Sequence, residues 1–206
     1  TLSSSSAASD VYKRQVVVGS YLEDSSTKGI NTTSNESASN SGAAYVFTRS
    51  GTTWSQQAYL KASNTGADDL FGWSVAISGD TVVIGAEGDD SSTTGINSAP
   101  NESASNSGAA YVFTRSGTTW SQQAYLKASN TGSDDQFGWS VAVSINTVLV
   151  SAKSEDSSTT GSNSTPNESA SNSGAAYVFF RNALLLTWSQ QAVSYTHLTL
   201  PTKRIV

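Results

Sequence analysis

An internal repeat of 66 residues constrains this chain more than any other feature of its sequence. Residues 35–66 recur without a change as residues 101–132. The same offset relates the tripeptide at 71–73 to the tripeptide at 137–139. A fixed period of this size indicates an array, in which one supersecondary unit is copied and stacked.

Within one period, apolar and polar residues alternate with a period of two, which is typical of β-strands. The alternating segments are short, contain many β-branched and aromatic residues, and are bounded by Gly, Asn, Asp and Ser. We therefore predict four strands in each repeat. In the central copy they span residues 71–78, 81–85, 108–115 and 120–128.

Each predicted strand has large side chains on one face and small ones on the other. In the third strand, for example, Tyr111 and Phe113 lie on the face opposite Ala110 and Val112. Small residues let the aromatic residues of a neighbouring sheet approach, so both faces of such a sheet are expected to be covered. Radially stacked four-stranded sheets of this kind are the blades of β-propellers. A β-solenoid would have shorter and more uniform turns, and a β-sandwich would not contain near-identical copies.

We therefore expect an all-β fold, namely a β-propeller fragment built from four-stranded antiparallel blades with a 66-residue repeat. Four motifs of the central copy support this expectation: Phe71-Gly72 followed by Ser74-Val75-Ala76, then Gly79-Asp80, then Val83-Ile84-Gly85-Ala86, and then Gly108-Ala109-Ala110-Tyr111-Val112-Phe113. Together they resemble the FG-GAP repeat, the blade motif of the integrin α-subunit propeller and of many bacterial surface proteins.

The resemblance covers about residues 16–192, and the next copy departs from it at Ser151-Ala152 and at Ser144-Ile145-Asn146. It implies a secreted or cell-surface location and a role in adhesion or recognition. It also implies a ring of seven blades, as in the integrin domains, which at this period would need roughly 460 residues.

The repeat loses its register at both ends of the chain. Residues 1–15 and 194–206 resemble translated sequencing-adapter read-through, so we exclude them from the predicted fold, with genuine irregular termini as the alternative. About two and two-thirds blades remain. They are a partial blade with strands two to four at 16–62, a complete blade at 63–128, and a third blade at 129–193 that is truncated in its fourth strand. We expect further blades of the same ring beyond this sequence.

Composition excludes several classes of function. The chain has no Cys, which rules out disulfides and Cys-ligated zinc, and its formal net charge of −5 argues against nucleic acid as a partner. Its one His lies in the C-terminal segment that we exclude, so we expect no His-dependent catalysis from the repeats. No apolar run approaches the roughly 18–20 residues that span a bilayer, so we expect no membrane insertion.

Acidic residues recur in the connections that the predicted topology places on one rim. The connection between the second and third strands has about 22 residues, begins with an acidic pair in every copy, and contains a later Glu. The connection between repeats adds an Asp pair on the same rim. The candidate ligand-binding residues are therefore Asp68, Asp69, Asp89, Asp90, Glu102, Asp134, Asp135, Glu155 and Asp156.

Two interpretations of these residues are open. Their oxygens are the ligands that Ca²⁺ prefers, so calcium is a possible cofactor. Acidic loop residues also commonly cap turns and keep a surface soluble. In integrin-type blades the calcium loop lies between the first and second strands, where this chain has only Ser78-Gly79-Asp80, so we assign no metal-binding residue.

The function that these features favour is a recognition or adhesion module that binds a protein or a carbohydrate through the rim of long connections. The first alternative is part of a polysaccharide-acting hydrolase or lyase with carboxylate chemistry. General acid–base chemistry needs carboxylates in distinct environments, whereas these are copied into similar loops. The second alternative is a structural spacer in a large surface protein. We assign no catalytic residue.

Overall fold

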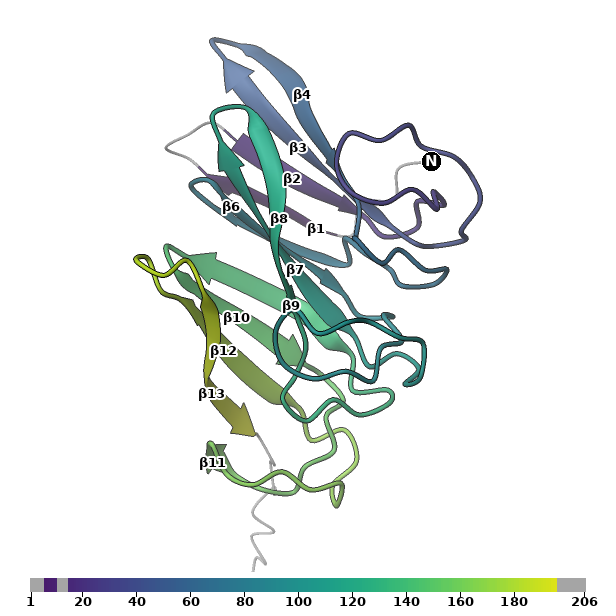
Figure 1. Cartoon of the computed structure of the whole chain (residues 1–206), viewed down its shortest axis with the longest axis vertical. Coiled ribbons are helices and arrows are strands. Elements are labelled where there is room, and N and C mark those ends of the chain that lie inside the picture. Colours follow the sequence, from purple (N-terminus) through teal and green to yellow (C-terminus); the bar gives the residue numbers. More distant parts are fainter. Residues whose placement is uncertain (1–5, 11–14, 196–206) are drawn as a thin grey trace, which may run out of the picture.

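The computed structural model describes residues 6–10 and 15–195 of the chain. These residues form three antiparallel sheets and no helix, and the sheets stack face to face along the length of the molecule (Figure 1). Each sheet holds one copy of the repeat. No helix that is long and apolar enough to cross a membrane occurs in this described part of the chain.

In each sheet, four strands are hydrogen-bonded to one another in chain order. The first sheet contains β1 (Ser6–Asp10), β2 (Gln15–Ser20), β3 (Ala43–Ser50) and β4 (Thr53–Leu60). The second contains β5 (Ser74–Ser78), β6 (Thr81–Ala86), β7 (Ala109–Ser116) and β8 (Thr119–Leu126). The third contains β9 (Phe137–Ser144), β10 (Thr147–Ala152), β12 (Ala175–Arg181) and β13 (Trp188–Tyr195), with the short β11 (Gly161–Ser162) paired to β13.

The prediction of four antiparallel strands per repeat is confirmed. The largest difference in the central copy is at the start of its first strand, which was expected at residue 71 and begins at Ser74. Phe71 instead forms a parallel bridge with Gly42 of the preceding repeat, so the backbone at this point links two sheets. The turn between β5 and β6 is the expected short one, with Gly79 in the left-handed region at a φ of 59°.

The two ends of the described chain differ from the prediction. Ser6–Asp10, which we excluded, forms strand β1 and pairs with β2 from Ser6–Gly19 to Asp10–Gln15. The first sheet therefore has four strands instead of three, because pairing requires only backbone N–H and C=O groups and β2 would otherwise be an open edge. At the other end, β13 continues past residue 193 to Tyr195. The adapter origin of both segments stays a prediction, and residues 1–5, 11–14 and 196–206 lie outside the described residues.

The predicted alternation of large and small faces is confirmed in the packing between sheets. The large face of the second sheet, with Tyr111 and Phe113 fully buried, packs on the small face of the first, which includes Val46 and Leu60. Phe71 lies in the same core, with its ring edge-on to Tyr111 at a centroid distance of 5.2 Å. The same arrangement recurs between the second and third sheets, so the described residues form two apolar cores of similar composition.

Glycine is required where the sheets are joined. Gly42 has a φ of 78°, and a Cβ built on it would lie 2.0 Å from the carbonyl oxygen of Phe71. Gly108 repeats this geometry, with a φ of 77° and a distance of 2.0 Å to the carbonyl oxygen of Phe137. Any side chain at these positions would therefore clash with backbone, which explains why the repeat retains Gly there.

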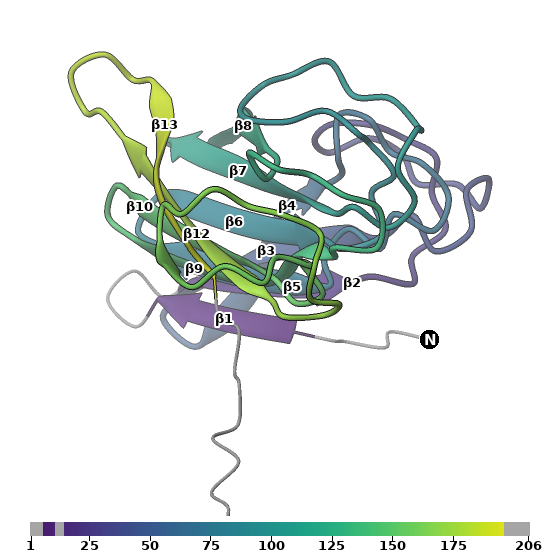
Figure 2. The ribbon, with the colours of Figure 1, turned by 90° about the horizontal axis from the view of Figure 1, so that it is seen from below.

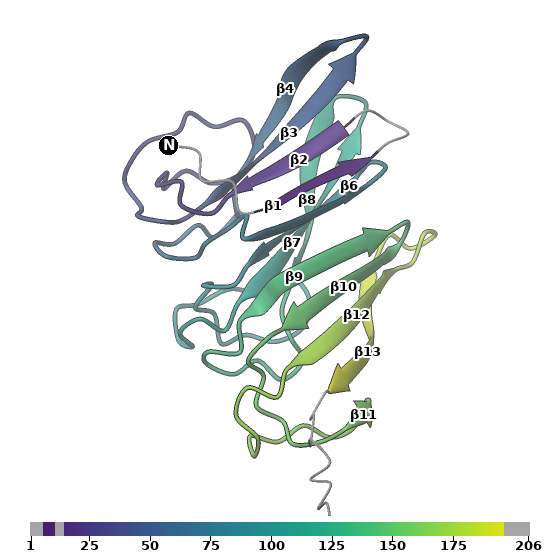
Figure 3. The same ribbon diagram turned by 180° about the vertical axis from the view of Figure 1, so that it is seen from behind.

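The first strands of the repeats lie side by side, since β1 contacts β5 and β5 contacts β9; β1 and β9 can be followed in Figure 3. This is the arrangement of the inner strands of a propeller. The long connections gather at one side of the molecule, and the hairpins lie at the opposite side (Figure 2). In the structure, the connections that were predicted to form one rim therefore lie together on one side of the molecule.

Candidate functional site

The rim is built from three copies of one long connection, at residues 21–42, 87–108 and 153–174. Each copy leaves the second strand, crosses to the outer strand of its own sheet, and returns to the third strand. In the second sheet, Ile96 bridges to Leu126, and the N–H of Asn97 donates to the carbonyl of Tyr125 at 2.8 Å. The connections are therefore attached to the sheets along their length.

Side-chain hydrogen bonds fix the interior of each connection. In the second copy, Asn101 Oδ1 accepts from the N–H groups of Ser92 and Ser103 at 2.9 and 3.1 Å. Ser91 Oγ accepts from the N–H of Asn101 at 3.1 Å. The same bonds recur around Asn35 in the first copy and Asn167 in the third. Ser and Asn favour local bonds of this kind, so much of the polar composition of these loops serves their structure.

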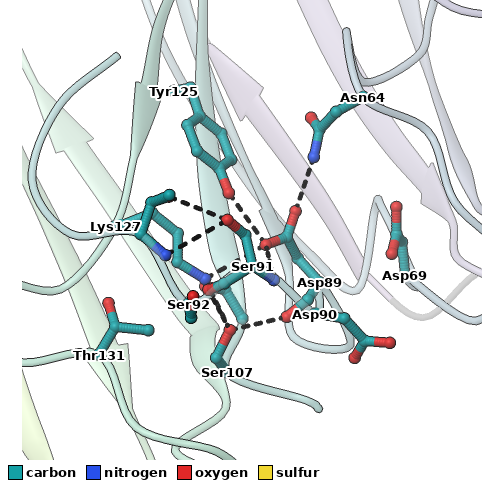
Figure 4. Close-up of polar contacts among 12 residues, drawn as sticks. Asn64, Asp69, Asp89, Asp90, Ser91, Ser92, Ser107, Tyr125, Lys127 and Thr131 are labelled. Carbon is teal, nitrogen blue, oxygen red and sulfur yellow. Dashed lines mark hydrogen bonds and ion pairs between the residues drawn. The ribbon is translucent and has the colours of Figure 1, made fainter. Parts of the chain in front are cut away.

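A buried ion pair anchors the connection of the second sheet (Figure 4). The carboxylate of Asp89 is 1% exposed and lies 3.2 Å from Nζ of Lys127, whose side chain is fully buried. Lys127 also donates to Ser107 Oγ at 2.7 Å and to the Gly108 carbonyl at 2.5 Å. Asp89 and Ser107 lie near the two ends of the connection, so one lysine closes the loop at its base.

Four further donors surround Asp89, and one of them is the N–H of Ser91, which donates to Oδ1 at 3.1 Å. Tyr125 OH donates to Oδ1 at 3.0 Å, and Tyr111 OH donates to Oδ2 at 3.0 Å. Asn64, in the segment between β4 and β5, donates to Oδ2 at 2.9 Å. A buried carboxylate is stable only with such partners. The network therefore joins the rim of the second sheet to the chain that arrives from the first.

Burial dominates the electrostatics of this network. It lowers the pKa of Lys127, while the neighbouring Asp89 opposes that change. Burial also raises the pKa of Tyr111 and of Tyr125, and the charge of Asp89 raises both further. Both phenols therefore stay protonated at neutral pH and remain hydrogen-bond donors to the carboxylate.

The network is copied with graded changes in the other sheets. In the first sheet, Glu23 replaces Asp89 and accepts from Lys61 Nζ at 3.0 Å and from Tyr59 OH at 2.8 Å. In the third sheet, Glu155 accepts from Asn130 at 2.8 Å. In this sheet Tyr195 pairs with Ala175, so it occupies the position in the strand pairing that Lys127 has in the second sheet. The anchor of the third connection thus lacks the cation.

The Asp pairs between repeats divide into one buried and one exposed residue. Asp69 is 3% exposed and accepts from the N–H of Gly66 at 2.6 Å, and burial, helped by the charge of Asp89, raises its pKa to about 7. Asp135 has the same burial and the same bond, to Gly132, and burial raises its pKa to about 7 as well. Asp68 is exposed and accepts from Asn40 at 2.8 Å.

The structure places all nine predicted site residues on the same rim but not at the same depth. The carboxylates of Asp69, Asp89, Asp135 and Glu155 are buried, and those of Asp90 and Asp156 are half-buried and accept from the N–H groups of Asn106 and Asn172. Asp68, Asp134 and Glu102 are exposed. Within residues 6–10 and 15–195, no group of three or more His, Cys, Asp or Glu side chains is placed to hold a metal ion.

Our sequence-based reasoning missed the buried lysines, the tyrosines and Asn64. A signal was present, because Tyr125 in β8 and Lys127 directly after it are two residues apart, and the residues between and before them, Leu126 and Ala124, are apolar. In a chain with only 13% charged residues, a lysine copied into a buried strand end indicates a structural ion pair.

An aromatic ladder lies on the inner part of the rim, where the first strands begin. Trp73 and Trp139, copies of one position, are half-buried and have ring centroids 5.0 Å apart, and Tyr21 meets Trp73 edge-on at 5.0 Å. Lys153 Nζ lies 3.8 Å from the ring centroid of Trp139. Glu87 is 5% exposed, and burial raises its pKa to about 7. Both indoles are therefore partly exposed and lie beside charged side chains.

Comparison with protein families gives one family. The family model of the FG-GAP repeat matches residues 54–113 and 120–179, which together are more than half of the chain. Each match runs from the fourth strand of one sheet to the third strand of the next. A comparison with curated proteins gives no match.

Proposed function

Because the chain belongs to the FG-GAP repeat family, we propose that it is an extracellular recognition module that binds a protein or a glycan through its rim. FG-GAP repeats are typical of adhesion and recognition propellers and usually occur in extracellular or surface proteins. The rim comprises the three long connections and the segments between repeats that contact them.

The observation that supports this proposal is the anchoring of the connections. Each is long enough to be flexible, yet each has a hydrogen-bonded carboxylate at its base, half-buried at Glu23 and buried at Asp89 and Glu155, and copied Ser and Asn bonds along its length. A loop that is ordered before binding loses less conformational entropy when it binds. Exposed Ser, Thr, Asn and Asp side chains on ordered loops can donate and accept hydrogen bonds, and the half-buried indoles offer stacking surfaces.

A hydrolase or lyase function receives less support. FG-GAP propellers are typically not enzymes. Acid and base roles require two carboxylates with different pKa values, whereas burial raises Asp69 and Asp135 alike to a pKa of about 7. Both accept from a glycine N–H in the same geometry, so nothing assigns them separate roles.

The proposal is tested by screening the purified chain against glycan arrays and cell-surface protein extracts. For any ligand found, we expect Glu102→Ala and Asp134→Ala, at exposed rim positions, to weaken binding by about tenfold or more. Thr118→Ala, in an exposed hairpin at the opposite side, is the matched control and should bind like the parent. Binding that survives both rim changes, or carboxylate-dependent cleavage of a polysaccharide, would overturn the proposal.

A further inference from the structure

Three consecutive leucines are exposed at the tip of the hairpin between β12 and β13. Leu184, Leu185 and Leu186 are 93%, 71% and 61% exposed. Asn182 orders the turn, since its Oδ1 accepts from the N–H groups of the first two leucines at 2.9 and 3.0 Å and its carbonyl accepts from the N–H of the third at 2.8 Å. Single apolar side chains are common on protein surfaces, whereas a contiguous exposed group indicates a site of interaction.

The copies of this hairpin show that its exposure does not depend on a missing neighbour. In the second sheet, which has a sheet packed on each face, the corresponding residues 116–119 are all exposed. Their sequence is Ser-Gly-Thr-Thr, and the first sheet has the same polar turn at residues 50–53. The third hairpin replaces it with a longer turn at residues 182–187 that contains the leucines. A sheet packed beside the third one would therefore leave this tip in contact with solvent.

In the second sheet, the arginine at the base of the hairpin is neutralised. Arg115 Nη2 lies 2.7 Å from Oδ1 of Asp80, and Arg115 Nη1 donates to Gln57 Oε1 at 2.9 Å. Trp120, which pairs with Arg115 across the hairpin, donates from Nε1 to the same glutamine oxygen at 3.0 Å. Both side chains at this position thus have acceptors within the protein.

In the third sheet, the same position lacks these acceptors. Arg181 and Trp188 pair across the hairpin, but Asn146 stands where the second sheet has Asp80. The N–H of Arg181 donates to the Asn146 carbonyl at 2.8 Å, so these two residues are neighbours. Within residues 6–10 and 15–195, the buried Nε of Arg181 and Nε1 of Trp188 have no hydrogen-bond partner, and no carboxylate forms an ion pair with Arg181. The leucine tip therefore stands on a cationic base without an anion.

The charges on this side of the molecule are complementary to an anionic surface. Each hairpin between the last two long strands of a sheet begins with a copied arginine, namely Arg49, Arg115 and Arg181. Among the described turns on this side, only Asp80 is acidic, and it is already paired with Arg115. The long connections, which contain the acidic pairs, lie at the opposite side (Figure 2).

We propose that this hairpin docks the protein on a lipid bilayer that contains anionic phospholipids. The leucine tip enters the boundary between headgroups and acyl chains, where apolar side chains leave water. Arg181 stays at the level of the headgroups, where its guanidinium donates to a lipid phosphate in place of the carboxylate that Asp80 supplies in the second sheet. This contact needs no apolar run that spans a bilayer, so the expectation of no membrane insertion applies only to a spanning segment.

Docking through this hairpin leaves the rim free. The hairpins and the long connections lie on opposite sides of the molecule, so a chain that is held by its leucine tip presents the rim to solvent (Figure 2). The proposal therefore goes beyond ligand recognition by the rim and does not depend on it.

The first experiment measures how the whole chain sediments with vesicles of phosphatidylcholine, with or without an equal amount of phosphatidylglycerol. We expect the parent to bind the mixed vesicles about tenfold or more tightly than pure phosphatidylcholine, and to be released as salt is added. The double variant Leu184→Ser with Leu185→Ser should lower the partition coefficient about tenfold or more. Leu22→Ser, at a rim leucine that is 43% exposed, is the matched control and should bind like the parent.

Supplying the missing carboxylate tests the role of Arg181. Asn146→Asp gives Arg181 the partner that Arg115 has in Asp80, so it should weaken binding to the mixed vesicles about fivefold. Ser103→Asp adds the same charge at an exposed position of the rim and should bind like the parent. Circular dichroism and thermal melting check that each variant is folded.

A fluorescent label shows which part of the molecule enters the bilayer. The chain has no Cys, so Leu185→Cys and Ser103→Cys can each be labelled with NBD at a single position. With mixed vesicles, the label at position 185 should become brighter and shift to shorter wavelengths, whereas the label at position 103 should not change.

The proposal is overturned if the parent does not bind mixed vesicles, if the double leucine variant binds like the parent, or if the label at position 185 does not respond. An Asn146→Asp variant that binds like the parent would overturn the role of Arg181. Sedimentation that depends on the leucines but needs no vesicles would also overturn the proposal, since the tip would then hold a second copy of the chain.

Discussion

Replacing Lys127 with methionine tests whether the buried ion pair holds the rim of the second sheet in place. Methionine retains most of the apolar stem but removes three donated bonds, to Asp89, Ser107 and the Gly108 carbonyl. It leaves the Asp89 carboxylate buried without its cation, although four other donors remain. Removing one member of a buried pair typically costs about 3–5 kcal/mol, and we expect a loss of this size in the free energy of unfolding.

Lys61→Met in the first sheet is the matched control. Its partner Glu23 has a side chain that is 14% exposed, whereas that of Asp89 is 1% exposed. Water can partly solvate Glu23 after the lysine is lost, so we expect a smaller cost of roughly 1–3 kcal/mol. Urea unfolding followed by tryptophan fluorescence gives both values.

Hydrogen exchange separates local from global effects of these changes. Lys127→Met should reduce amide protection in residues 87–108 and leave residues 21–42 protected, because each lysine closes only its own connection. The ion pair does not determine the order of the rim if Lys127→Met lowers the free energy of unfolding by less than about 1 kcal/mol. The same conclusion holds if Lys61→Met lowers the free energy of unfolding by more than Lys127→Met does.

Three further outcomes follow from the same structure. Asp135 has a pKa of about 7 when folded against about 3.9 when unfolded, so the folded state binds its proton more tightly and stability falls as pH rises from about 4 to about 7. Asn has no proton to lose in this range, so the free energy of urea unfolding of Asp135→Asn, minus that of the parent, should increase from about pH 4 to about pH 7. A difference that stays constant with pH would contradict the raised pKa of Asp135. Gly108→Ala should destabilise by more than about 1 kcal/mol because its Cβ would meet backbone, whereas Gly117→Ala, with a φ of 62° and open space around it, should cost only about 1 kcal/mol. Equal melting temperatures for the two variants would count against the backbone clash. Trp73→Ala should weaken the binding of any glycan found by screening if the aromatic ladder stacks on that glycan, and titration calorimetry with Trp54→Ala, in strand β4, supplies the comparison.

The fold could be predicted from sequence because three local signals agree. The 66-residue copies establish an array, the alternation around Tyr111 and Phe113 establishes strands with unequal faces, and the glycines and short turns establish where strands end. The alternation and the turns depend on residues close together in the chain, and the repeat, which needs only a comparison of the sequence with itself, confirms them in every copy. The strand formed by Ser6–Asp10 was missed because its side chains carry no such pattern and its pairing depends on the backbone alone.

The site was only partly predictable because its chemistry depends on contacts between distant residues. The acidic pairs were visible in sequence, but their depth was not. Asp68 and Asp69 are neighbours, yet one is exposed and the other is 3% exposed, because Asp68 adopts a φ of 62° and the following carboxylate turns inward to Gly66. Asp89 and Lys127 are 38 residues apart, and no periodicity relates them.

Identical sequence does not guarantee an identical environment, and this limits what the repeat can predict about binding. Residues 35–66 and 101–132 have the same side chains, but Trp54 is 46% exposed and Trp120 is 4% exposed, since among the described residues the second copy has a sheet on both sides and the first copy has a sheet on one side. The surface that a repeat presents is therefore set by its neighbours in the array as much as by its own residues. The rim differs in this respect, because each of its connections is anchored mainly within its own sheet. Its anchors weaken only where the residues change, as at Tyr195, so the rim of the third sheet should be the least protected of the three in hydrogen exchange.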